Sequence, residues 1–462
     1  MKLFEETLKK HQVRLERFDG KKFTALVDGK NFDISNLSES GMMIKDYHGQ
    51  KNFNLKVMYH ETVVYEGNGR VARKIDNDSG IILDPFLKTD MLQAINRCES
   101  LYNQFTKSSK IHRDINTNYI HLVAEMRMFF DNAKHYLDEL EEEIHTSSLD
   151  VKKSYWSIAE NLIFPKMVNE LKKYSAKIHK FTEGLSEDSY QIYKNYFQTC
   201  LLDYYKYSSF VSRSLDRPLG YAGDYVMMMQ VYREDFDGIT LFGKMINQWA
   251  INESSSESVR LRKTYLRERI SKYIRSNDRE LSIVSMACGP AMEVADLIDD
   301  LSHDELKRVS FILLDQDQEA LTQVKRNINR SLIKNQKTAN VYIVPMSVKR
   351  IFQDDPIFKE IANHGVDFLY TAGLYDYLTQ PLAIEFTRRL FNSLNPNGQI
   401  IVGNFHPSNP SQTIGDFCGN WRLLHRDEKD MNELVEGLEV SESWLHFDEL
   451  GIDVFLNAIK QG

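Results

Sequence analysis

Cysteine and proline are scarce in this chain, and each scarcity narrows what the protein can be. The 462 residues include 4 cysteines and 10 prolines. Cys98, Cys200, Cys288 and Cys418 are scattered, and no spacing of cysteine and histidine suggests a zinc site. Because paired cysteines mark oxidising compartments, we expect reduced thiols in a cytoplasmic protein without a bound metal.

Long apolar runs and an excess of positive charge are also missing. No apolar stretch approaches the roughly 20 residues that a transmembrane helix needs. Residues 1–18, MKLFEETLKKHQVRLERF, are charged throughout and lack the apolar centre of a signal peptide. The net charge of −8 argues against nucleic acid as a partner. A hydrophobic content of 42% and a charged content of 27% indicate a soluble globular protein, and the length allows several domains.

Residues 1–88 consist of short β-favouring runs separated by glycine, asparagine and aspartate. The runs are KFTALVDG, FDIS, GMMIKDY, FNLKVMY, TVVYEGNGRVARKI and SGIILDP. So many short strands in so short a segment predict a small antiparallel β-barrel.

Residues 89–214 change to a helical period, with apolar residues three and four positions apart in MLQAINRCESLYNQF, YIHLVAEMRMFFDNAKHYLDELEEEI and YQIYKNYFQTCLLDYYKYSSFVSRSL. Pro165 is the only proline in this region, so long helices are permitted. We expect a helical bundle or helical hairpin through which the chain can form a homodimer. Its aromatic side chains either pack the core or line an apolar substrate pocket; they are Tyr102, Phe129, Phe130, Tyr136, Tyr190, Tyr193, Phe197, Tyr204 and Tyr205.

Residues 215–462 alternate between strand-like and helix-like segments, which predicts a doubly wound α/β domain. The whole chain is therefore expected to combine α+β and α/β parts: a small barrel, a helical middle region and a Rossmann-like domain. The predicted strands are 281–286, 309–314, 340–345, 366–371 and 398–404, and the predicted helices are 256–275, 291–301, 317–331 and 379–393.

Several of these strands end in turn-forming or polar clusters that suit a ligand site. In SMACGPAMEV the small residues Ala287, Gly289 and Ala291 let the backbone approach a ligand, and a helix begins there with free N–H groups. Asp315 ends the next apolar strand, where a carboxylate would accept hydrogen bonds from ribose hydroxyls. Alternatively, Asp315 is an N-cap or turn residue, and Glu293 is a carboxylate favoured by the helix dipole.

The pattern resembles the class I S-adenosylmethionine (SAM)-dependent methyltransferases. ACGPAMEV stands at that family's glycine-rich loop, LDQD at its ribose-binding acid, and LNPNGQIIVGNF at its L-x-P-G-G turn. This chain departs from the family at Ser285, Ala287 and Ala291, and alanine replaces glycine readily only where φ is negative. The resemblance implies SAM as cofactor, with these binding residues: Asp224, Ala287, Cys288, Gly289, Pro290, Glu293, Asp315, Gln316, Ser347, Ala372 and Gly373.

A narrower resemblance covers residues 200–430. RPLGYAGDYVMM, SMACGPAMEV, LLDQDQEAL, YTAGLYDYL and IVGNFHPSNP look like the bacterial methyltransferases that make 3-hydroxy fatty acid methyl esters. The resemblance implies an O-methyltransferase that acts on a fatty acyl carboxylate. Such a carboxylate is already ionised at neutral pH, so its methylation needs alignment and exclusion of water rather than a general base.

Polar residues at the predicted strand ends are the candidates for orienting that carboxylate. The catalytic candidates are Tyr221, Tyr375, Tyr377 and His406, with Asn404 beside them. Two alternatives stay open: RPLGYAGDY is a turn between domains, and His406 is a surface histidine. Further possible substrate contacts follow the last motif; they are Trp421, Arg422, His425 and Arg426.

The barrel segment resembles PilZ domains, which commonly bind cyclic di-GMP. Asn36, Ser38 and Gly41 fit the D/N-x-S-x-x-G motif of that family. Arg14 and Arg17 stand where PilZ domains carry R-x-x-x-R, but they are spaced too closely. Arg17 with Lys21 gives only R-x-x-x-K, and lysine lacks the planar fork of arginine. The barrel therefore either binds cyclic di-GMP or serves packing or dimerisation.

Two other functions remain open from the sequence. The chain is alternatively a cyclic di-GMP-responsive binding protein whose SAM-binding domain is a signalling module, or an enzyme that methylates a different small acid or amine.

Overall fold

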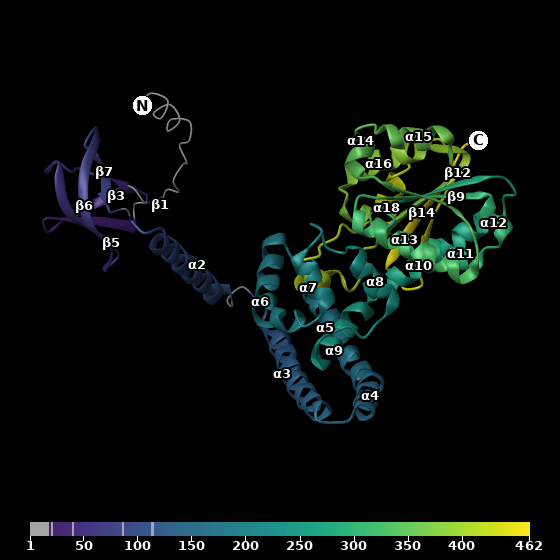
Figure 1. The fold of residues 1–462 in the computed structure, drawn as a ribbon, viewed down its shortest axis with the longest axis horizontal. Coiled ribbons are helices and arrows are strands. Elements are labelled where there is room, and N and C mark those ends of the chain that lie inside the picture. Colours follow the sequence, from purple (N-terminus) through teal and green to yellow (C-terminus); the bar gives the residue numbers. More distant parts are fainter. Residues whose placement is uncertain (1–17, 20–21, 39–40, 86, 112–114) are drawn as a thin grey trace. The chain divides into compact units, whose positions relative to one another are not determined.

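The computed structural model describes residues 18–19, 22–38, 41–85, 87–111 and 115–462 (Figure 1). The chain divides into two compact units, Met1–Arg113 and Asp114–Gly462. Each unit contains its own seven-stranded sheet.

The sheet of the first unit closes into an antiparallel barrel. Its strands are β1 (Phe18–Asp19), β2 (Phe23–Val27), β3 (Lys30–Ser38), β4 (Gly41–Ile44), β5 (Asn52–Tyr59), β6 (Thr62–Ile75) and β7 (Asp78–Asp84). The sheet order is β1-β3-β2-β5-β6-β7-β4, and a further β3–β4 pairing joins its ends. Alternate residues of β2 are buried, as expected of strands with one face toward a core. The predicted barrel is confirmed.

Helix α2 (Thr89–Ile111) follows the barrel and contacts it through Glu99. The Glu99 carboxylate accepts a hydrogen bond from Lys22 Nζ at 2.6 Å and another from the Tyr59 hydroxyl. This pair of contacts ties α2 to β5 and to the residue before β2.

The second unit begins with helices. They are α3 (Thr117–His145), α4 (Leu149–Ile158), the π-helix η2 (Ala159–Ile163), α5 (Phe164–Thr182), α6 (Glu187–Tyr205), α7 (Ser209–Asp216), α8 (Tyr225–Arg233), α9 (Leu241–Asn252) and α10 (Ser254–Arg275). Pro165 lies in the first turn of α5, and the π-helix η2 stands directly before it, so the helical run continues past the proline with a local change of hydrogen-bond pattern.

The aromatic side chains of this region divide by burial. Phe130, Phe197 and Tyr205 are fully buried and contact one another in a chain of rings. Tyr102 and Tyr136 are exposed. The expectation of core packing holds for the buried group, and the cavity described below is lined by other aromatic residues.

The second sheet has the order β10-β9-β8-β11-β12-β14-β13. Its strands are β8 (Leu281–Met286), β9 (Val309–Asp315), β10 (Asn340–Pro345), β11 (Val366–Ala372), β12 (Leu394–Phe405), β13 (Val440–Phe447) and β14 (Asp453–Lys460). Strands β8 to β12 are parallel, and β14 runs antiparallel to both β12 and β13. The predicted doubly wound fold is confirmed, whereas the β13–β14 hairpin lies in a segment without a predicted strand.

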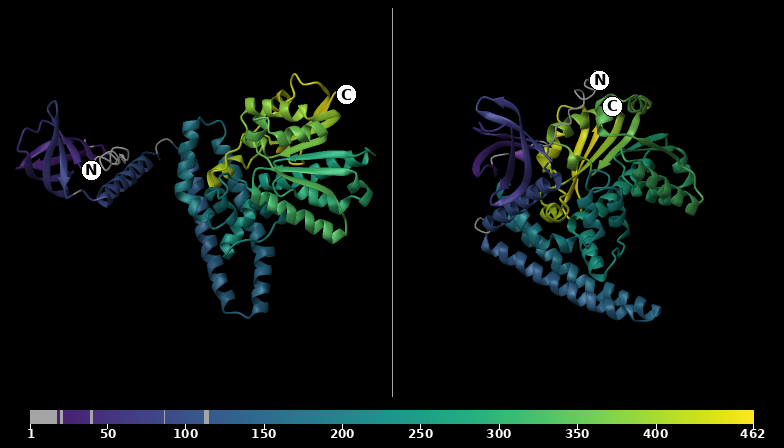
Figure 2. Two further views of the ribbon diagram at one scale, coloured as in Figure 1. Left: turned by 45° about the horizontal axis from the view of Figure 1, so that its top comes forward. Right: turned by 60° about the vertical axis from the view of Figure 1, so that its left-hand side comes forward.

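Helices cover both faces of this sheet (Figure 2). They are α11 (Met292–Asp300), α12 (His303–Lys307), α13 (Gln318–Asn335), α14 (Val348–Phe352), α15 (Pro356–His364), the 3-10 helix η3 (Tyr375–Tyr377), α16 (Gln380–Asn392), α17 (Gln412–Gly419) and α18 (Glu428–Glu433). Ile283 packs into one core cluster with α10, α11 and α13, and its neighbour Val284 packs into the other with α16. A sheet buried on both faces explains why its parallel strands read as apolar runs.

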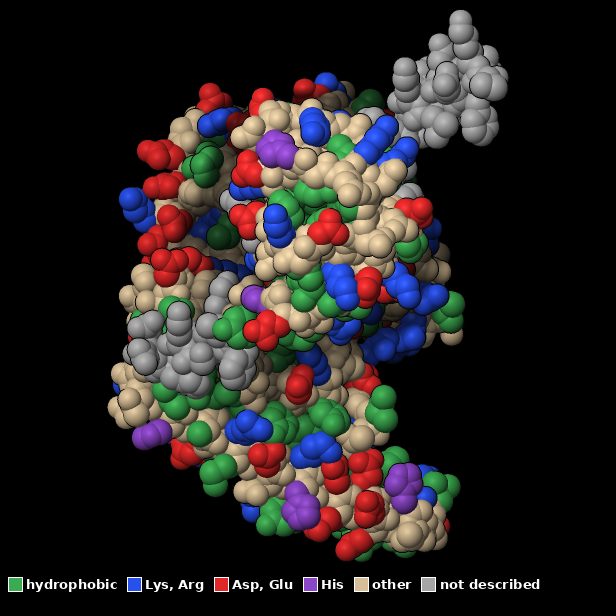
Figure 3. Space-filling model, turned by 90° about the vertical axis from the view of Figure 1, so that its left-hand side faces the viewer, with side chains coloured by type: hydrophobic (Ala, Val, Ile, Leu, Met, Phe, Trp, Pro, Cys, Tyr) green, Lys and Arg blue, Asp and Glu red, His purple; other side chains and the backbone are tan. Residues whose placement is uncertain are grey.

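The surface in Figure 3 shows acidic and basic side chains interspersed over the described residues. None of the helices in the described ranges is long and apolar enough to cross a membrane.

Candidate functional site

A cavity of about 410 Å³ lies at the carboxyl ends of the parallel strands in the second unit. The strand order reverses at β8, which has β9 on one side and β11 on the other. Open α/β sheets bind ligands at such a switch point, because two neighbouring loops diverge there and leave a crevice. The ends of β8, β9, β11 and β12 form one wall of the cavity, and residues of α7 to α10 and α17 form the other. Its size is typical of small-molecule and cofactor sites.

The loop after β8 carries Ala287, Cys288, Gly289 and Pro290 to the cavity wall. Gly289 has φ of +53°, and a Cβ placed there would meet no atom within 4 Å, so the backbone faces open space. Ala287 and Ala291 also have positive φ, at 55° and 47°. Alanine therefore stands here in the conformation that favours glycine, rather than at the negative φ that makes the replacement easy.

Asp315 joins the end of β9 to this loop. Its Oδ2 accepts a hydrogen bond from the Gly289 N–H at 2.8 Å, and its Oδ1 accepts one from the Asp317 N–H at 2.9 Å. The side chain is 7% exposed, and burial raises the pKa of its carboxyl. Asp317, not Asp315, caps α13, because its side chain accepts from the Glu319 N–H. A carboxylate has about four acceptor positions, so Asp315 retains acceptor capacity toward the cavity that it lines.

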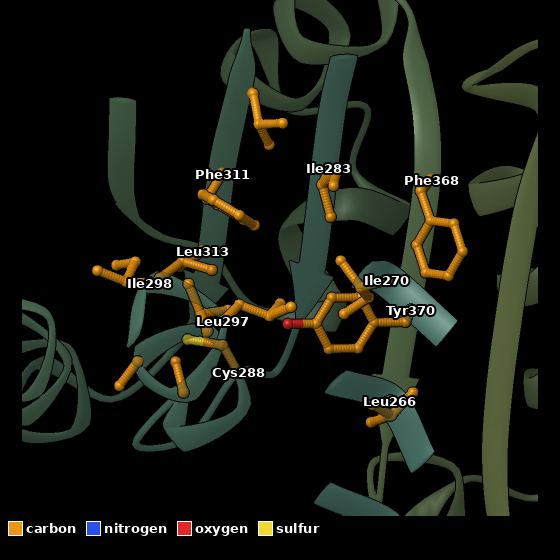
Figure 4. Packing of buried hydrophobic residues seen from close by; sticks show 14 of the residues in the cluster. Leu266, Ile270, Ile283, Cys288, Leu297, Ile298, Phe311, Leu313, Phe368 and Tyr370 are labelled. Carbon is orange, nitrogen blue, oxygen red and sulfur yellow. The ribbon is translucent and has the colours of Figure 1, made fainter. Parts of the chain in front are cut away.

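Glu293 lies under the same loop, in the first turn of α11. The Tyr370 hydroxyl donates to Glu293 Oε1 at 2.7 Å. Figure 4 shows the Tyr370 ring extending from β11 toward the loop that holds Cys288. Burial raises the pKa of the Glu293 carboxyl, which is 7% exposed. Both residues line the cavity, and their hydrogen bond links α11 to β11 beneath it.

The remaining predicted cofactor residues divide into two groups. Gln316, Ser347, Ala372 and Gly373 all line the cavity. Asp224 is not part of its lining: it caps α8 and accepts hydrogen bonds from Arg213 Nε at 2.7 and 2.8 Å. The structure therefore gives Asp224 a structural partner and leaves the other four beside the cavity.

The segment RPLGYAGDY forms part of the cavity wall and is held there by two aromatic residues. The Tyr377 hydroxyl donates to the Ala222 carbonyl at 2.9 Å and accepts from Trp421 Nε1 at 2.8 Å. A Cβ on Gly223 would lie 2.2 Å from Cζ2 of Trp421. The Tyr221 hydroxyl lies 3.4 Å from Asp317 Oδ2. We call Tyr221, Gly223, Tyr377 and Trp421 the latch.

The structure does not bring Tyr375 and His406 to the cavity. The Tyr375 side chain is fully buried, with its hydroxyl 2.8 Å from Thr387 Oγ1. The His406 imidazole is 2.8 Å from Ser408 Oγ and 3.3 Å from Glu428 Oε2. Neither is part of the cavity lining. The physical reason at Tyr375 is the tight turn of η3, which directs residues 375 and 377 to different sides.

The candidate substrate contacts that follow the last motif differ in whether they reach the cavity. His425 and Trp421 line the cavity, and burial lowers the pKa of His425 to about 4. Arg422 instead pairs with Glu187 at 2.6 Å. Arg426 donates to the Tyr375 carbonyl at 2.7 Å and to Asn404 Oδ1 at 2.6 Å, so it organises the strand end behind the cavity.

Four charged residues of the lining were not predicted from the sequence; they are Glu253, Arg262, Lys263 and Asp376. Glu253 accepts hydrogen bonds from Ser175 at 2.7 Å and from Ser411 at 2.8 Å, and burial raises its pKa. Arg262 is 6% exposed on α10 and faces the end of β11. The segment 254–275 carries many basic residues, and nothing in its sequence marks the two that reach the cavity, Arg262 and Lys263.

In the barrel, Ser38 Oγ donates to the Gly41 carbonyl at 2.9 Å. Asn36 pairs with Met43 across β3 and β4. Arg14 and Arg17 lie outside the described residues.

No protein-family model and no curated protein matches the sequence. Among solved structures, the chain is similar to a possible exported protein from Bordetella parapertussis, with 14% identity, 66% of this chain and 99% of that chain covered, and a TM-score of 0.45. It is also similar to magnesium protoporphyrin IX methyltransferase from Synechocystis PCC 6803 with bound SAH, with 11% identity, 54% and 98% covered, and a TM-score of 0.35. The N-methyltransferase NodS from Bradyrhizobium japonicum WM9 gives 12% identity, 44% and 96% covered, and a TM-score of 0.29. Likenesses this distant assign no activity to the chain, so its function has to follow from the site.

Proposed function

We propose that this chain is a SAM-dependent O-methyltransferase that converts the carboxylate of a 3-hydroxy fatty acid, or of a similar small acid, into a methyl ester. The observation that carries the proposal is the position of Asp315. Its carboxylate ends β9 beside the switch point, lines the cavity and does not cap the following helix. A carboxylate in this place suits the two hydroxyls of a ribose.

The residues present fit an adenosine-containing cofactor. A Cβ added to Gly289 would meet no atom within 4 Å, so a ligand can approach the backbone of this residue closely. Gln316 and Ser347 extend the lining beyond Asp315, on the side of β10. When bound, SAM would supply a methyl group on a positively charged sulfonium.

The chain's own residues would then align the acceptor and exclude water. The latch joins segments of the cavity wall that lie far apart in the sequence. Tyr221 and Tyr377 are the polar candidates that remain at the cavity, whereas Tyr375 and His406 are not part of this proposal. A carboxylate acceptor is ionised at neutral pH, so no residue has to remove a proton.

The rest of the lining supports an acyl substrate. Beyond the residues proposed for the cofactor, the cavity wall has an apolar surface. Its apolar side chains include Phe210, Val211, Met228, Val231 and Leu423. Apolar side chains with a few convergent polar groups are typical of pockets for amphiphilic small molecules.

The test is incubation of the full chain with SAM and 3-hydroxy fatty acids of increasing length, followed by mass spectrometry. We expect methyl ester and S-adenosylhomocysteine in equal amounts, and loss of both in Asp315→Ala. The matched control is Asp304→Asn, whose carboxylate is exposed on α12. SAM binding without methyl ester at any chain length would remove the substrate assignment and would favour methylation of a different small acid or amine.

A regulatory role for the barrel is a second proposal. It rests on the closed antiparallel barrel and on the Ser38–Gly41 contact within the N-x-S-x-x-G motif. In this proposal residues 1–88 sense cyclic di-GMP, 89–214 form the helical middle region, and 215–462 carry the methyltransferase site, to whose lining the end of the middle region adds Phe210, Val211 and Ser214. Calorimetric titration of the full chain with cyclic di-GMP tests it: we expect binding that is weakened by Ser38→Ala, and no heat at high micromolar ligand would contradict it. A homodimer and a cytoplasmic location stay predictions.

A further inference from the structure

Polar side chains meet at the end of the cavity that lies away from Asp315. The sheet order places β12 beyond β11 from β8 and β9, and the chain after β12 carries Asn409, Ser411 and His425. All three line the cavity together with Glu253, the residue before α10. This part of the wall is therefore separate from the residues proposed for the cofactor, which stand at the ends of β8 to β11. We call Glu253, Asn409, Ser411 and His425 the polar end.

Hydrogen bonds hold the side chains of the polar end in place. Ser411 Oγ donates to Glu253 Oε2 at 2.8 Å, and Ser175 Oγ of α5 donates to Oε1 at 2.7 Å. The Ser411 N–H donates to Asn409 Oδ1 at 3.0 Å. Because this backbone donor fixes the orientation of the amide, Asn409 Nδ2 is the group that faces His425 Nε2, at 3.4 Å. The polar end is therefore one continuous network along the cavity wall.

The direction of these bonds makes His425 a hydrogen-bond acceptor. Asn409 Nδ2 can only donate, so His425 Nε2 carries a lone pair, and the ring is neutral. Burial lowers the pKa of His425 to about 4, although a hydrogen bond to the Leu423 backbone opposes this shift. The bond from Asn409 is long at 3.4 Å, so Nε2 can accept from a better-placed donor. His425 is also half-buried, whereas the other members of the polar end are buried, so its ring is the one that a ligand can reach.

Glu253 adds further acceptor capacity to this end of the cavity. A carboxyl group has about four acceptor positions, and the two serine hydroxyls take one on each oxygen. Within the described part of the chain, the Trp249 indole N–H lies beside this carboxyl without a well-formed hydrogen bond. Glu253 stands at the N-cap of α10, yet its side chain does not cap the helix. The polar end therefore presents lone pairs to a ligand and calls for a hydrogen-bond donor.

We infer that the polar end binds a hydroxyl group of the acyl acid through His425, so that the enzyme prefers hydroxylated acids to unsubstituted ones. This inference rests on the proposed function and deepens it. A neutral hydroxyl can donate to His425 Nε2. A carboxylate has no hydrogen to donate, so the lone pairs of His425 and Glu253 would repel it. The reacting carboxylate is thereby left to the part of the cavity nearer the cofactor residues.

Methyl ester formation by the full chain from two acids of equal length tests the inference. They are a 3-hydroxy fatty acid and its unsubstituted counterpart, at the length that the wild type esterifies best. We expect kcat/KM to favour the hydroxy acid by about 10-fold, the effect of one hydrogen bond to a buried group. His425→Phe keeps a ring and loses the acceptor, so it should lower kcat/KM about 10-fold for the hydroxy acid and less than about 2-fold for the unsubstituted acid. Asn409→Asp should also remove the preference, because its carboxylate would accept from Nε2 and place a proton where the lone pair was.

His303→Phe is the matched control, because His303 is exposed on α12 and is not part of the cavity lining. It should leave both rates unchanged. A wild type that esterifies the two acids equally well would overturn the inference. Equal lowering of both rates by His425→Phe would also overturn it, because His425 would then only shape the cavity. Methyl ester from neither acid would remove the proposed function, and the inference with it. If His425→Phe does not fold, Asn409→Asp decides with the same pair of acids.

Discussion

The alanines of the β8 loop carry backbone strain beside the cavity. Ala287 and Ala291 have φ of 55° and 47°, in the left-handed region where a Cβ costs about 1–2 kcal/mol. The two positions differ in their surroundings. Ala287 is half-buried on the cavity wall, whereas Ala291 is fully buried in the core cluster with Val294 and Leu321. The pair therefore separates the effect of φ from the effect of packing.

Ala287→Gly should change the free energy of unfolding by between zero and about +1.5 kcal/mol. The removed strain of about 1–2 kcal/mol is offset by the greater freedom of glycine in the unfolded chain, about 0.5–1 kcal/mol. Ala291→Gly should be less stable than Ala287→Gly by about 1 kcal/mol, because it also loses a buried methyl group. Urea denaturation measures both. A strongly destabilised Ala287→Gly would show that the methyl group makes a contact more important than the strain.

The sequence predicts which side chains lie at the cavity only where their place along a strand decides it. Asp315 ends an apolar run, so its place at the strand end follows from the sequence. Tyr375 and Tyr377 looked equivalent, yet one is in the core and the other is at the cavity. A 3-10 turn of 3 residues has no period from which to read a direction. Arg262 was missed for a related reason, since which basic residue of α10 turns inward depends on how the helix packs on the sheet.

At the scale of elements, the latch joins a loop, a turn and the segment after α17. Gly223 has φ of +75°, and its missing Cβ leaves room for the Trp421 ring. Gly220, in the same loop, has φ of +86° but meets no atom within 4 Å of an added Cβ. The two glycines therefore share a backbone requirement, and only Gly223 also has a packing requirement.

Gly223→Ala should open the latch, and Gly220→Ala should not. Both variants carry the strain of alanine at positive φ, about 1–2 kcal/mol, and Gly223→Ala adds overpacking of about 1–3 kcal/mol against Trp421. We expect Gly223→Ala to weaken S-adenosylhomocysteine binding at least about 10-fold, because the cavity wall moves. Calorimetric titration with denaturation measures both effects. Equal affinities in the two variants would mean that the latch does not shape the cavity.

Strands could be predicted where both faces are buried. Strands β8, β9 and β11 read as apolar runs because helices cover both sides of the sheet there. The β13 strand has exposed and half-exposed residues along VSESWLHF, so its sequence resembles a loop. β14 is buried but contains Asp453 and Asn457, which interrupt the pattern. The insertion of β14 between β12 and β13 depends on long-range pairing, which no local pattern records.

At the scale of the whole molecule, Asp453 makes stability depend on pH. Burial raises its pKa from about 4 to about 8. The folded protein therefore keeps this proton over a range in which the unfolded chain has lost it. The contribution of Asp453 to stability is fully present below about pH 4 and is lost as the pH rises toward about 8.

Asp453→Asn should remove this dependence, because the amide does not titrate. The difference in Tm between variant and wild type should shift in favour of the variant as the pH rises from about 5 to about 8. Differential scanning calorimetry across that range measures it. A difference that stays constant would mean that Asp453 is ionised throughout, paired with Arg262 as a salt bridge.

The division into two units predicts which part of the chain binds the cofactor. Every residue that lines the cavity belongs to the described part of the second unit, between Phe210 and His425. The helices before β8 supply one wall, so the sheet alone would leave the cavity open on that side. A chain of residues 114–462 should therefore bind S-adenosylhomocysteine with the affinity of the full chain, within about 2-fold, whereas a chain that begins at residue 277 should not. Calorimetric titration compares the three. Weakened binding by 114–462 would mean that the barrel unit contributes to the cofactor site, which would favour a regulatory link between the barrel and the enzyme.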